Sequence, residues 1–375
     1  MKDTYVSVLD KTKSLGATYA EIRAQKNNNT FINVVDGQIE AVTLAKEAGA
    51  AVRVLADGAW GFSTTNSLSP KDLEKSAKSA LTMAKTAGKS IRTPVKLAEG
   101  KPVEDTVKVH VKKDPREIDI KTKIDNLLSI NSCFKFDQRI KSVTVRYADL
   151  TTEQTLGTTE GTFINQEKRV VWNYCWVTGK SNEIMASARD EVGMHGYELF
   201  DTETPESIAQ RVSRRVIQQL EAKTPKGGEH RAIIGTNIVG VLAHEALGHI
   251  CEADLTLAGS ALMGKLGQKI ADEKVTIYDT APEDELIREV KDGYYVRSVQ
   301  GAHQSNPDTG DFSVAITPAW RIMKGEIQHA VKGVMIAGNV YDLLNKIGLM
   351  GEETRQVGSF IAPKVVVTEL NVISK

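Results

Sequence analysis

The chain has 375 residues, of which 41% are hydrophobic and 26% are charged, as in an ordinary globular protein with two or three domains. Lysine plus arginine and aspartate plus glutamate both number 48, so the zero net charge gives no electrostatic reason to expect a nucleic acid or an anionic membrane as partner. Three widely spaced cysteines without a CxxC pair argue against a disulfide framework, and no apolar run is long enough to span a membrane. We therefore expect a soluble, cytoplasmic protein.

The N-terminal part predicts a helix, an antiparallel meander and a second helix. Apolar positions within residues 4–15 suit a short amphipathic helix. The pairs Asp36-Gly37 and Asp57-Gly58 are strong signals for tight turns between strands. Ser69 before Pro70 is typical of a helix start, and the apolar repeat that follows ends at Gly88. Strands are expected at residues 20–24, 30–35, 38–44 and 49–55.

The middle of the chain predicts a linker, two helices and four strands. Residues 92–113 carry two prolines and a glycine without a clear period, so they are expected to form a linker that could subdivide the first domain. Asp114-Pro115 and Thr204-Pro205 each predict the start of a helix, because proline is favoured at the first helical position. The expected strands are residues 143–147, 161–165, 170–177 and 184–191.

The main domain boundary is expected near residue 224, where the sequence Thr-Pro-Lys-Gly-Gly interrupts the pattern. This gives an N-terminal α+β domain over residues 1–224 and a C-terminal domain over residues 225–375. A strand at residues 230–234 should lead into an apolar helix that continues through residue 249. Further strands are expected at residues 275–278, 294–299, 312–317, 319–323 and 327–331. The predicted fold class is α+β, with mixed, mainly antiparallel sheets and packed helices, in an N-terminal α/β unit and a C-terminal strand-rich domain.

Two histidines flank a glutamate in the segment His244-Glu245-Ala-Leu-Gly-His249. Neutral imidazoles bind zinc, and a carboxylate beside the metal can take a proton from its bound water. The best-known form of this motif has histidines at i and i+4, whereas the i and i+5 spacing here separates them by about 140° around an ideal helix. Both reach one metal only if the helix widens or ends between them, which Gly248 would allow. A purely structural alternative stays open. In it, His244 is a helix histidine whose hydrogen bonds are satisfied within the fold, and His249 caps the C-terminus of the helix.

The residues around this motif resemble a known family. HEALGH followed by Glu252-Ala-Asp254, and then by two glycine-containing stretches at 259–260 and 264–267, is similar to the metal-binding segment of TldD/PmbA-type peptidases. Agreeing segments in the same order make the resemblance more specific than the motif alone. They lie at residues 16–23, 49–62, 305–313 and 322–327.

The resemblance implies a zinc-dependent peptidase that hydrolyses peptide bonds of unfolded or small peptides. It places the two zinc ligands at His244 and His249 and the general base at Glu245, with one zinc per chain in the C-terminal metallopeptidase domain. It also implies an enclosed site shared between two subunits, so the expected partners are peptide substrates and either a second copy or a related chain.

The chain departs from the family at the third metal ligand. Family members with metal chemistry typically supply a cysteine near the C-terminus, and the matching residues 347–355 contain none. A non-catalytic partner subunit of a TldD/PmbA-type complex is therefore the alternative, and a hydrolase of non-peptide amides is a third. The candidates for the missing ligand are Cys251, Glu252, His303 and Glu352, or a water or substrate oxygen.

Overall fold

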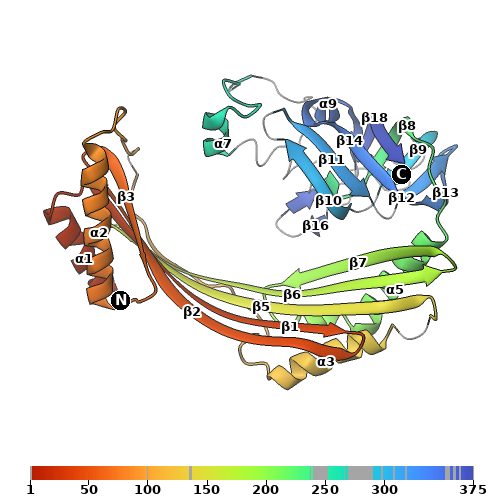
Figure 1. Cartoon of the computed structure of the whole chain (residues 1–375), viewed down its shortest axis with the longest axis horizontal. Coiled ribbons are helices and arrows are strands. Elements are labelled where there is room, and N and C mark those ends of the chain that lie inside the picture. Colours follow the sequence, from red (N-terminus) through yellow and green to blue (C-terminus); the bar gives the residue numbers. More distant parts are fainter. Residues whose placement is uncertain are drawn as a thin grey trace. The chain divides into compact units, whose positions relative to one another are not determined.

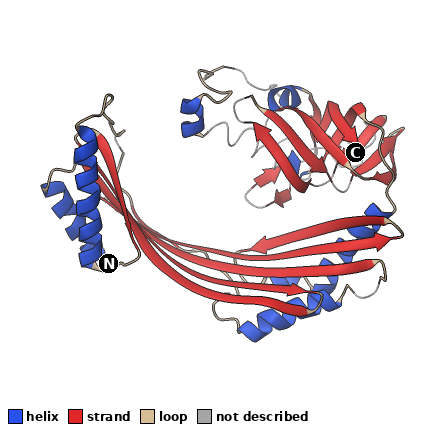
Figure 2. Ribbon diagram, in the orientation of Figure 1, coloured by secondary structure: helices blue, strands red, loops and turns tan. Residues whose placement is uncertain are grey.

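A computed structural model of the chain (Figures 1 and 2) combines mixed and antiparallel sheets with packed helices, which confirms the predicted α+β class. No helix among the described residues is long and apolar enough to cross a membrane. The structure describes residues 2–98, 100–134, 137–236, 238–239, 252–265, 267–268, 290–296, 299–306, 309–316, 319–350, 355–357, 360–362 and 365–374.

The chain forms two compact units. The first comprises Met1–Cys133, Thr144–Cys175 and Glu191–Ile208, and the second comprises Phe134–Val143, Trp176–Asp190 and Ala209–Lys375. The division at residue 224 stays a prediction.

One long sheet runs through the N-terminal part of the chain. Its elements are α1 (Lys2–Ser14), β1 (Tyr19–Val35), β2 (Gln38–Ala56), β3 (Ala59–Thr65), α2 (Pro70–Gly88), β4 (Glu104–Val107), α3 (Ile120–Ser132), β5 (Ile140–Thr158), β6 (Phe163–Ser181), β7 (Ile184–Met194), α4 (Leu199–Thr202) and α5 (Pro205–Leu220). The strand order is β3-β2-β1-β5-β6-β4, with β7 paired to β6. Neighbouring strands β3, β2, β1 and β5 are antiparallel, and the short β4 runs parallel to β6.

Strands β1 and β2 are each longer than the sequence predicts. The two strands expected at 20–24 and 30–35 are parts of β1, because the polar residues between them bond across the sheet instead of forming a loop. Asn27 Oδ1 accepts hydrogen bonds from Thr152 Oγ1 (3.0 Å) and Gln25 Nε2 (2.8 Å), and Gln154 Nε2 donates to Gln25 Oε1 (2.8 Å). A polar run therefore continues a strand when its side chains find cross-strand partners.

Both Asp-Gly turns are confirmed. Asp36 and Gly37 have φ of 49° and 83°, and Asp57 and Gly58 have φ of 51° and 74°. Positive φ at both central residues is the backbone of a type I′ hairpin turn, which asparagine, aspartate and glycine tolerate best. These turns join β1 to β2 and β2 to β3.

The second helix begins as predicted and packs tightly on the sheet (Figure 1). Ser69 is the N-cap of α2, and its hydroxyl accepts a hydrogen bond from the Asp72 backbone N–H (3.2 Å). Helix α2 covers β2 and β3, where Gly61 lies directly against the helix backbone. A Cβ at Gly61 would stand 1.8 Å from Ala80 O and 2.6 Å from Ala84 N, so only glycine fits there. The buried face of α2 consists of Leu73, Ser76, Ala77, Ala80, Leu81 and Ala84.

The helix predicted to start at Asp114-Pro115 starts later, at Ile120, so that prediction is wrong by one and a half turns. Asp114 instead closes a turn, because its carboxylate accepts hydrogen bonds from the Arg116 backbone N–H (3.0 Å) and from Arg116 Nη2 (2.7 Å). Asp119 takes the N-cap position of α3 and accepts from the Lys121 N–H (3.2 Å). The helix predicted at Thr204-Pro205 is confirmed as α5.

Helix α3 is attached to the sheet by a buried polar cluster. Lys123 Nζ lies 2.6 Å from Asp149 Oδ2, and both side chains are almost fully buried. The Tyr147 hydroxyl donates to the same carboxylate (2.8 Å), and burial raises the pKa of Tyr147 well above its ordinary value, with the Asp149 charge adding to the effect. Lys123 and Asp149 neutralise each other's charge, so removing either side chain would leave a buried charge without a partner of opposite sign.

A second sheet is built from the C-terminal strands. Its strands and the helices between them are β8 (Gly228–Ile234), α7 (Ala253–Ala258), β9 (Asp292–Val296), β10 (Val299–Asn306), β11 (Asp311–Ile316), β12 (Ala319–Met323), β13 (Glu326–Val331), β14 (Val334–Asn339), α9 (Val340–Asn345), β15 (Ile347–Met350) and β18 (Val365–Ser374). The short strands β16 (Arg355–Val357) and β17 (Phe360–Ala362) pair with each other in a separate two-stranded sheet. The order is β10-β11-β14-β18-β8-β9-β12-β13, with β15 paired to β18. All described pairs in this sheet are antiparallel except β8 with β9.

Most strands expected in this part are confirmed. The strand at 319–323 is β12, and Lys324-Gly325, with φ of 54° and 77°, forms the turn into β13. The strand expected at 294–299 corresponds to β9 and the first residue of β10. The strand expected at 275–278 lies outside the described residues.

Gly61→Ala tests the close approach of β3 to α2. The added methyl must displace helix backbone, so we expect the free energy of unfolding to fall by about 3 kcal/mol, measured by urea denaturation followed by circular dichroism. Gly100→Ala is the matched control, because nothing lies within 4 Å of a Cβ built there. Equal stability of the two variants would contradict this packing.

Candidate metal centre

The residues before the histidine motif form β8, which lies inside the C-terminal sheet. It pairs antiparallel with β18, where Ile234 faces Val365, and parallel with β9, where Ile234 faces Val296. Ala232, Ile233 and Ile234 are all buried, at 0–1% exposure. A strand that is hydrogen-bonded on both edges and buried on both faces is a rigid base for the segment that follows it.

The chain passes from this strand directly into the first turn of a helix. The Gly235 N–H donates to Val296 O (2.6 Å), and Gly235 O accepts from the N–H groups of Ile238 (2.9 Å) and Val239 (3.1 Å). Ile238 is fully buried in the main core cluster of the second unit, and Val239 packs against the same cluster. The predicted passage from strand to helix is therefore confirmed as far as Val239.

The three residues predicted to carry the chemistry, His244, Glu245 and His249, lie outside the described residues. Their roles stay predictions. Within the part of the chain that the structure describes, no three histidine, cysteine, aspartate or glutamate side chains come close enough together to hold a metal ion.

Of the four candidates for a third ligand, Cys251 and Glu352 also lie outside the described residues. Glu252 is exposed and stands immediately before α7, and its side chain does not cap that helix. Helix α7 ends at Ala258 and is capped by Gly259, whose φ of 111° requires glycine, and the Ser260 N–H donates to Leu255 O (3.0 Å). The described residues 252–260 of the region that resembles the family's metal segment thus form a short helix closed by a glycine.

Gly301 and the Asn306-Pro307 pair in the sequence predict a loop around His303, and this prediction is wrong because His303 lies in strand β10, opposite Val314 of β11. The register of β10 and β11 shifts twice, between Val299 and Gly301 and between Gly301 and His303. Two irregularities this close together interrupt the alternation that identifies a strand in a sequence. His303 stays a candidate ligand, now placed in a strand.

Two other histidines have backbone partners. His195 Nδ1 lies 2.9 Å from Arg169 O. His230 Nε2 lies 3.2 Å from Lys226 O, and its ring meets the ring of Tyr294 edge-on, with the centroids 5.1 Å apart. These contacts fit structural roles for both residues.

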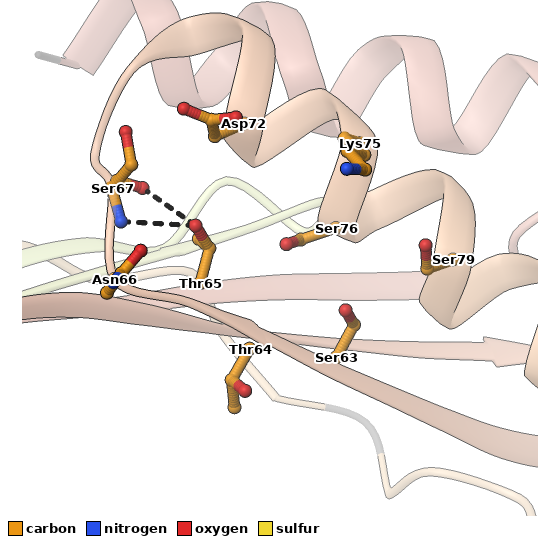
Figure 3. A pocket seen from close by; sticks show the side chains of 9 residues that line it. All are labelled: Ser63, Thr64, Thr65, Asn66, Ser67, Asp72, Lys75, Ser76 and Ser79. Atoms are coloured by element: carbon orange, nitrogen blue, oxygen red, sulfur yellow. Dashed lines mark hydrogen bonds between the residues drawn. The ribbon is translucent and has the colours of Figure 1, made fainter.

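A polar pocket of about 300 Å³ lies between β3 and α2 in the first unit (Figure 3). Its one carboxylate, Asp72, accepts a hydrogen bond from Ser69 Oγ (2.6 Å), and hydrogen bonds from the Ser69 and Ser67 hydroxyls hold the pKa of Asp72 below its ordinary value. No histidine, cysteine or glutamate lines the pocket, so its chemistry does not fit a zinc centre. The lining residues are Ser63, Thr64, Thr65, Asn66, Ser67, Asp72, Lys75, Ser76 and Ser79.

Three family models match the chain in succession. The model of PmbA/TldA metallopeptidase domain 1 matches residues 20–84, and that of the central domain matches residues 113–220. The model of the C-terminal domain matches residues 227–284 and 279–374. Together the three models cover most of the chain, including the histidine motif.

Several curated relatives are named metalloproteases. One from Methanothermobacter thermautotrophicus is 27% identical, with 90% of this chain and 88% of the relative covered. A metalloprotease of Methanocaldococcus jannaschii is 31% identical over 70% of this chain and 58% of its own length. A zinc metalloprotease TldD homolog of Saccharolobus solfataricus is 23% identical, with 92% and 91% covered.

Solved structures share the fold over nearly the whole chain. A candidate modulator of a DNA gyrase from Thermotoga maritima has a TM-score of 0.83 at 19% identity, with 99% of this chain and 100% of that chain covered. TldE from Thermococcus kodakarensis has a TM-score of 0.77 at 18% identity, with 98% and 99% covered. With the three family models matched in order, the chain belongs to the TldD/PmbA family of metallopeptidases.

Proposed function

We propose that this chain is a zinc-dependent peptidase that hydrolyses peptide bonds in unfolded or small peptides. The observation that carries the proposal is the passage from β8 into a helix whose first turn is anchored in the core by Ile238. The HEALGH sequence follows this turn along the chain, and β8 itself is paired on both edges. The metalloprotease names of the relatives support the same reaction class.

The residues of the motif have two kinds of proposed role, metal binding and proton transfer. His244 and His249 would hold the metal, and a zinc ion bound there would polarise the attacking water and the peptide carbonyl. Glu245 would accept the proton of the water and pass it to the leaving amine. Gly248 would let the backbone leave ideal helical geometry, which the i and i+5 spacing requires.

Substrates are proposed to bind through their main chain. A peptide laid along an open strand edge is held by backbone hydrogen bonds, which carry little sequence preference. Among the described strands of the C-terminal sheet, β10 and β13 stand at the ends of the strand order. A bound peptide contacted only through its side chains would count against this mode.

The second candidate function is a non-catalytic partner subunit. The observation that favours it is the sequence from Ile347 to Arg355, which has no cysteine where metal-binding relatives supply their third ligand. Such a subunit would help to enclose peptides without cleaving them.

Metal analysis separates these two functions. We expect about one zinc per purified chain, lost in His244→Ala because one of the two imidazole ligands is removed. His195→Ala is the matched control, since His195 has a backbone partner in the first unit, and it should keep its zinc. A chain that stays free of zinc and inactive after metal loading would instead support the non-catalytic subunit.

Glu245→Gln tests the general base apart from metal binding. The amide cannot accept a proton, so we expect full zinc content and a peptidase rate at least about a hundredfold lower. A variant with unchanged rate would show that Glu245 is not the base.

Ile238→Ala tests whether the core anchor supports the metal centre. Removing a fully buried side chain should lower the free energy of unfolding by about 3 kcal/mol and speed the loss of zinc to a chelator, because the first turn of the helix loosens. Ile373→Ala is the control, since Ile373 is 43% exposed on β18 of the same sheet. Unchanged zinc retention in a destabilised Ile238→Ala variant would contradict the coupling.

A further inference from the structure

The polar pocket between β3 and α2 opens beside the close contact that joins these two elements. Gly61 of β3 lies against the helix backbone at Ala80. Side chains alternate along a strand, so Ser63 and Thr65 face the helix on the same side as Gly61. Across the gap from them stands Ser76 of α2 (Figure 3). Protein interiors are normally close-packed, and these short hydroxyl side chains leave the space between strand and helix unfilled.

The pocket contains a buried hydroxyl without a protein partner. Ser76 is only 5% exposed, and its hydroxyl points into the space between helix and strand (Figure 3). Within the part of the chain that the structure describes, this side chain neither donates nor accepts a hydrogen bond, and the same holds for Ser63 opposite. Buried polar groups are normally hydrogen-bonded. A polar ligand in the pocket would supply the missing partner.

Two opposite charges also line the pocket. Hydrogen bonds from the hydroxyls of Ser69 and Ser67 keep the pKa of Asp72 below its ordinary value, so this side chain is a carboxylate at neutral pH. They use two of its about four acceptor positions. Lys75 follows three residues later on α2 and forms no ion pair or hydrogen bond with any described residue. A ligand can therefore reach one group of each sign.

We propose that this pocket binds a small free α-amino acid in its zwitterionic form. The ammonium group of the ligand lies against the Asp72 carboxylate, and its carboxylate group lies against the Lys75 ammonium group. The hydroxyls of Ser63 and Ser76 complete the hydrogen bonds, because a hydroxyl both donates and accepts. The site lies within the first unit and does not depend on the proposed peptidase activity.

The charge and size of the pocket favour this ligand over other polar molecules. A phosphate ion gains the charge of Lys75 but is repelled by Asp72, and an amine meets the reverse situation. A neutral sugar leaves both charges without a counter-charge. The volume of about 300 Å³ is at the lower end of the range for ligand pockets, so the ligand is small. Every lining residue carries a hydroxyl, an amide or a charge, so a polar amino acid such as L-serine fits best.

Titration of the full chain with L-serine, followed by ligand-observed NMR, tests the site. We expect saturable binding of one L-serine per chain. L-Glycerate has a hydroxyl in place of the ammonium group, and serinol has a hydroxymethyl group in place of the carboxylate. Each should bind at least about tenfold more weakly, because one charge pair is lost. Absence of saturable L-serine binding would overturn the proposal, and so would tighter binding of inorganic phosphate or glucose.

Variants of the two charged residues assign each charge to its part of the ligand. Asp72→Asn should weaken L-serine binding about tenfold and leave L-glycerate binding unchanged, because L-glycerate has no ammonium group. Lys75→Met should weaken L-serine binding by the same factor and leave serinol binding unchanged. Lys78→Met is the matched control, since Lys78 is exposed on the same helix and does not line the pocket. Equal loss of all three ligands in either variant would show damage to the fold and contradict the assignment.

Ser76→Ala tests the buried hydroxyl. Because this hydroxyl has no partner among the described residues, its removal should not lower the free energy of unfolding, measured by urea denaturation. The affinity for L-serine should fall about fivefold, since a hydrogen bond to the ligand is lost. A destabilised variant that binds L-serine as tightly as the wild type would contradict the proposal.

Discussion

The C-terminal unit depends on strand β8, because both of its edges are occupied by backbone hydrogen bonds to β18 and β9. Its last residues, Ile233 and Ile234, have no exposure to solvent beyond 1%, and the helix that follows is anchored at once by Ile238. A metal ligand works only if its position is held, and packing against a doubly paired strand restricts that position more than a surface loop could. The histidine motif begins six residues after this anchor.

The first unit is held together by polar contacts within the sheet and between the sheet and its helices, and by one close glycine contact. Its long strands carry polar residues in their middle, and these are tolerated because Gln25, Asn27 and their partners on β5 bond to one another across the sheet. Helix α3 is attached by the buried pair of Lys123 and Asp149, and α2 by the glycine contact of β3.

Much of the fold could be predicted from local signals. Both Asp-Gly turns, the Ser69 cap and the strand β12 follow from residues whose backbone preferences are strong and local. The errors arose where a specific side-chain partner decides the local structure. Asn27 continues a strand because Thr152 lies opposite, and Asp114 closes a turn because Arg116 reaches back to it. His303 lies in a strand whose two register shifts hide its alternation. At the site, the sequence predicts two ligands and a base, whereas the third ligand depends on residues brought together by the fold.

Zinc K-edge X-ray absorption of the purified chain tests the proposed zinc site directly, because it reports the atoms bound to the metal. We expect a zinc ion with two imidazole ligands, one of which is lost in His249→Ala. A bound zinc whose absorption spectrum is unchanged by that substitution, or a chain that takes up no zinc at all, would contradict it.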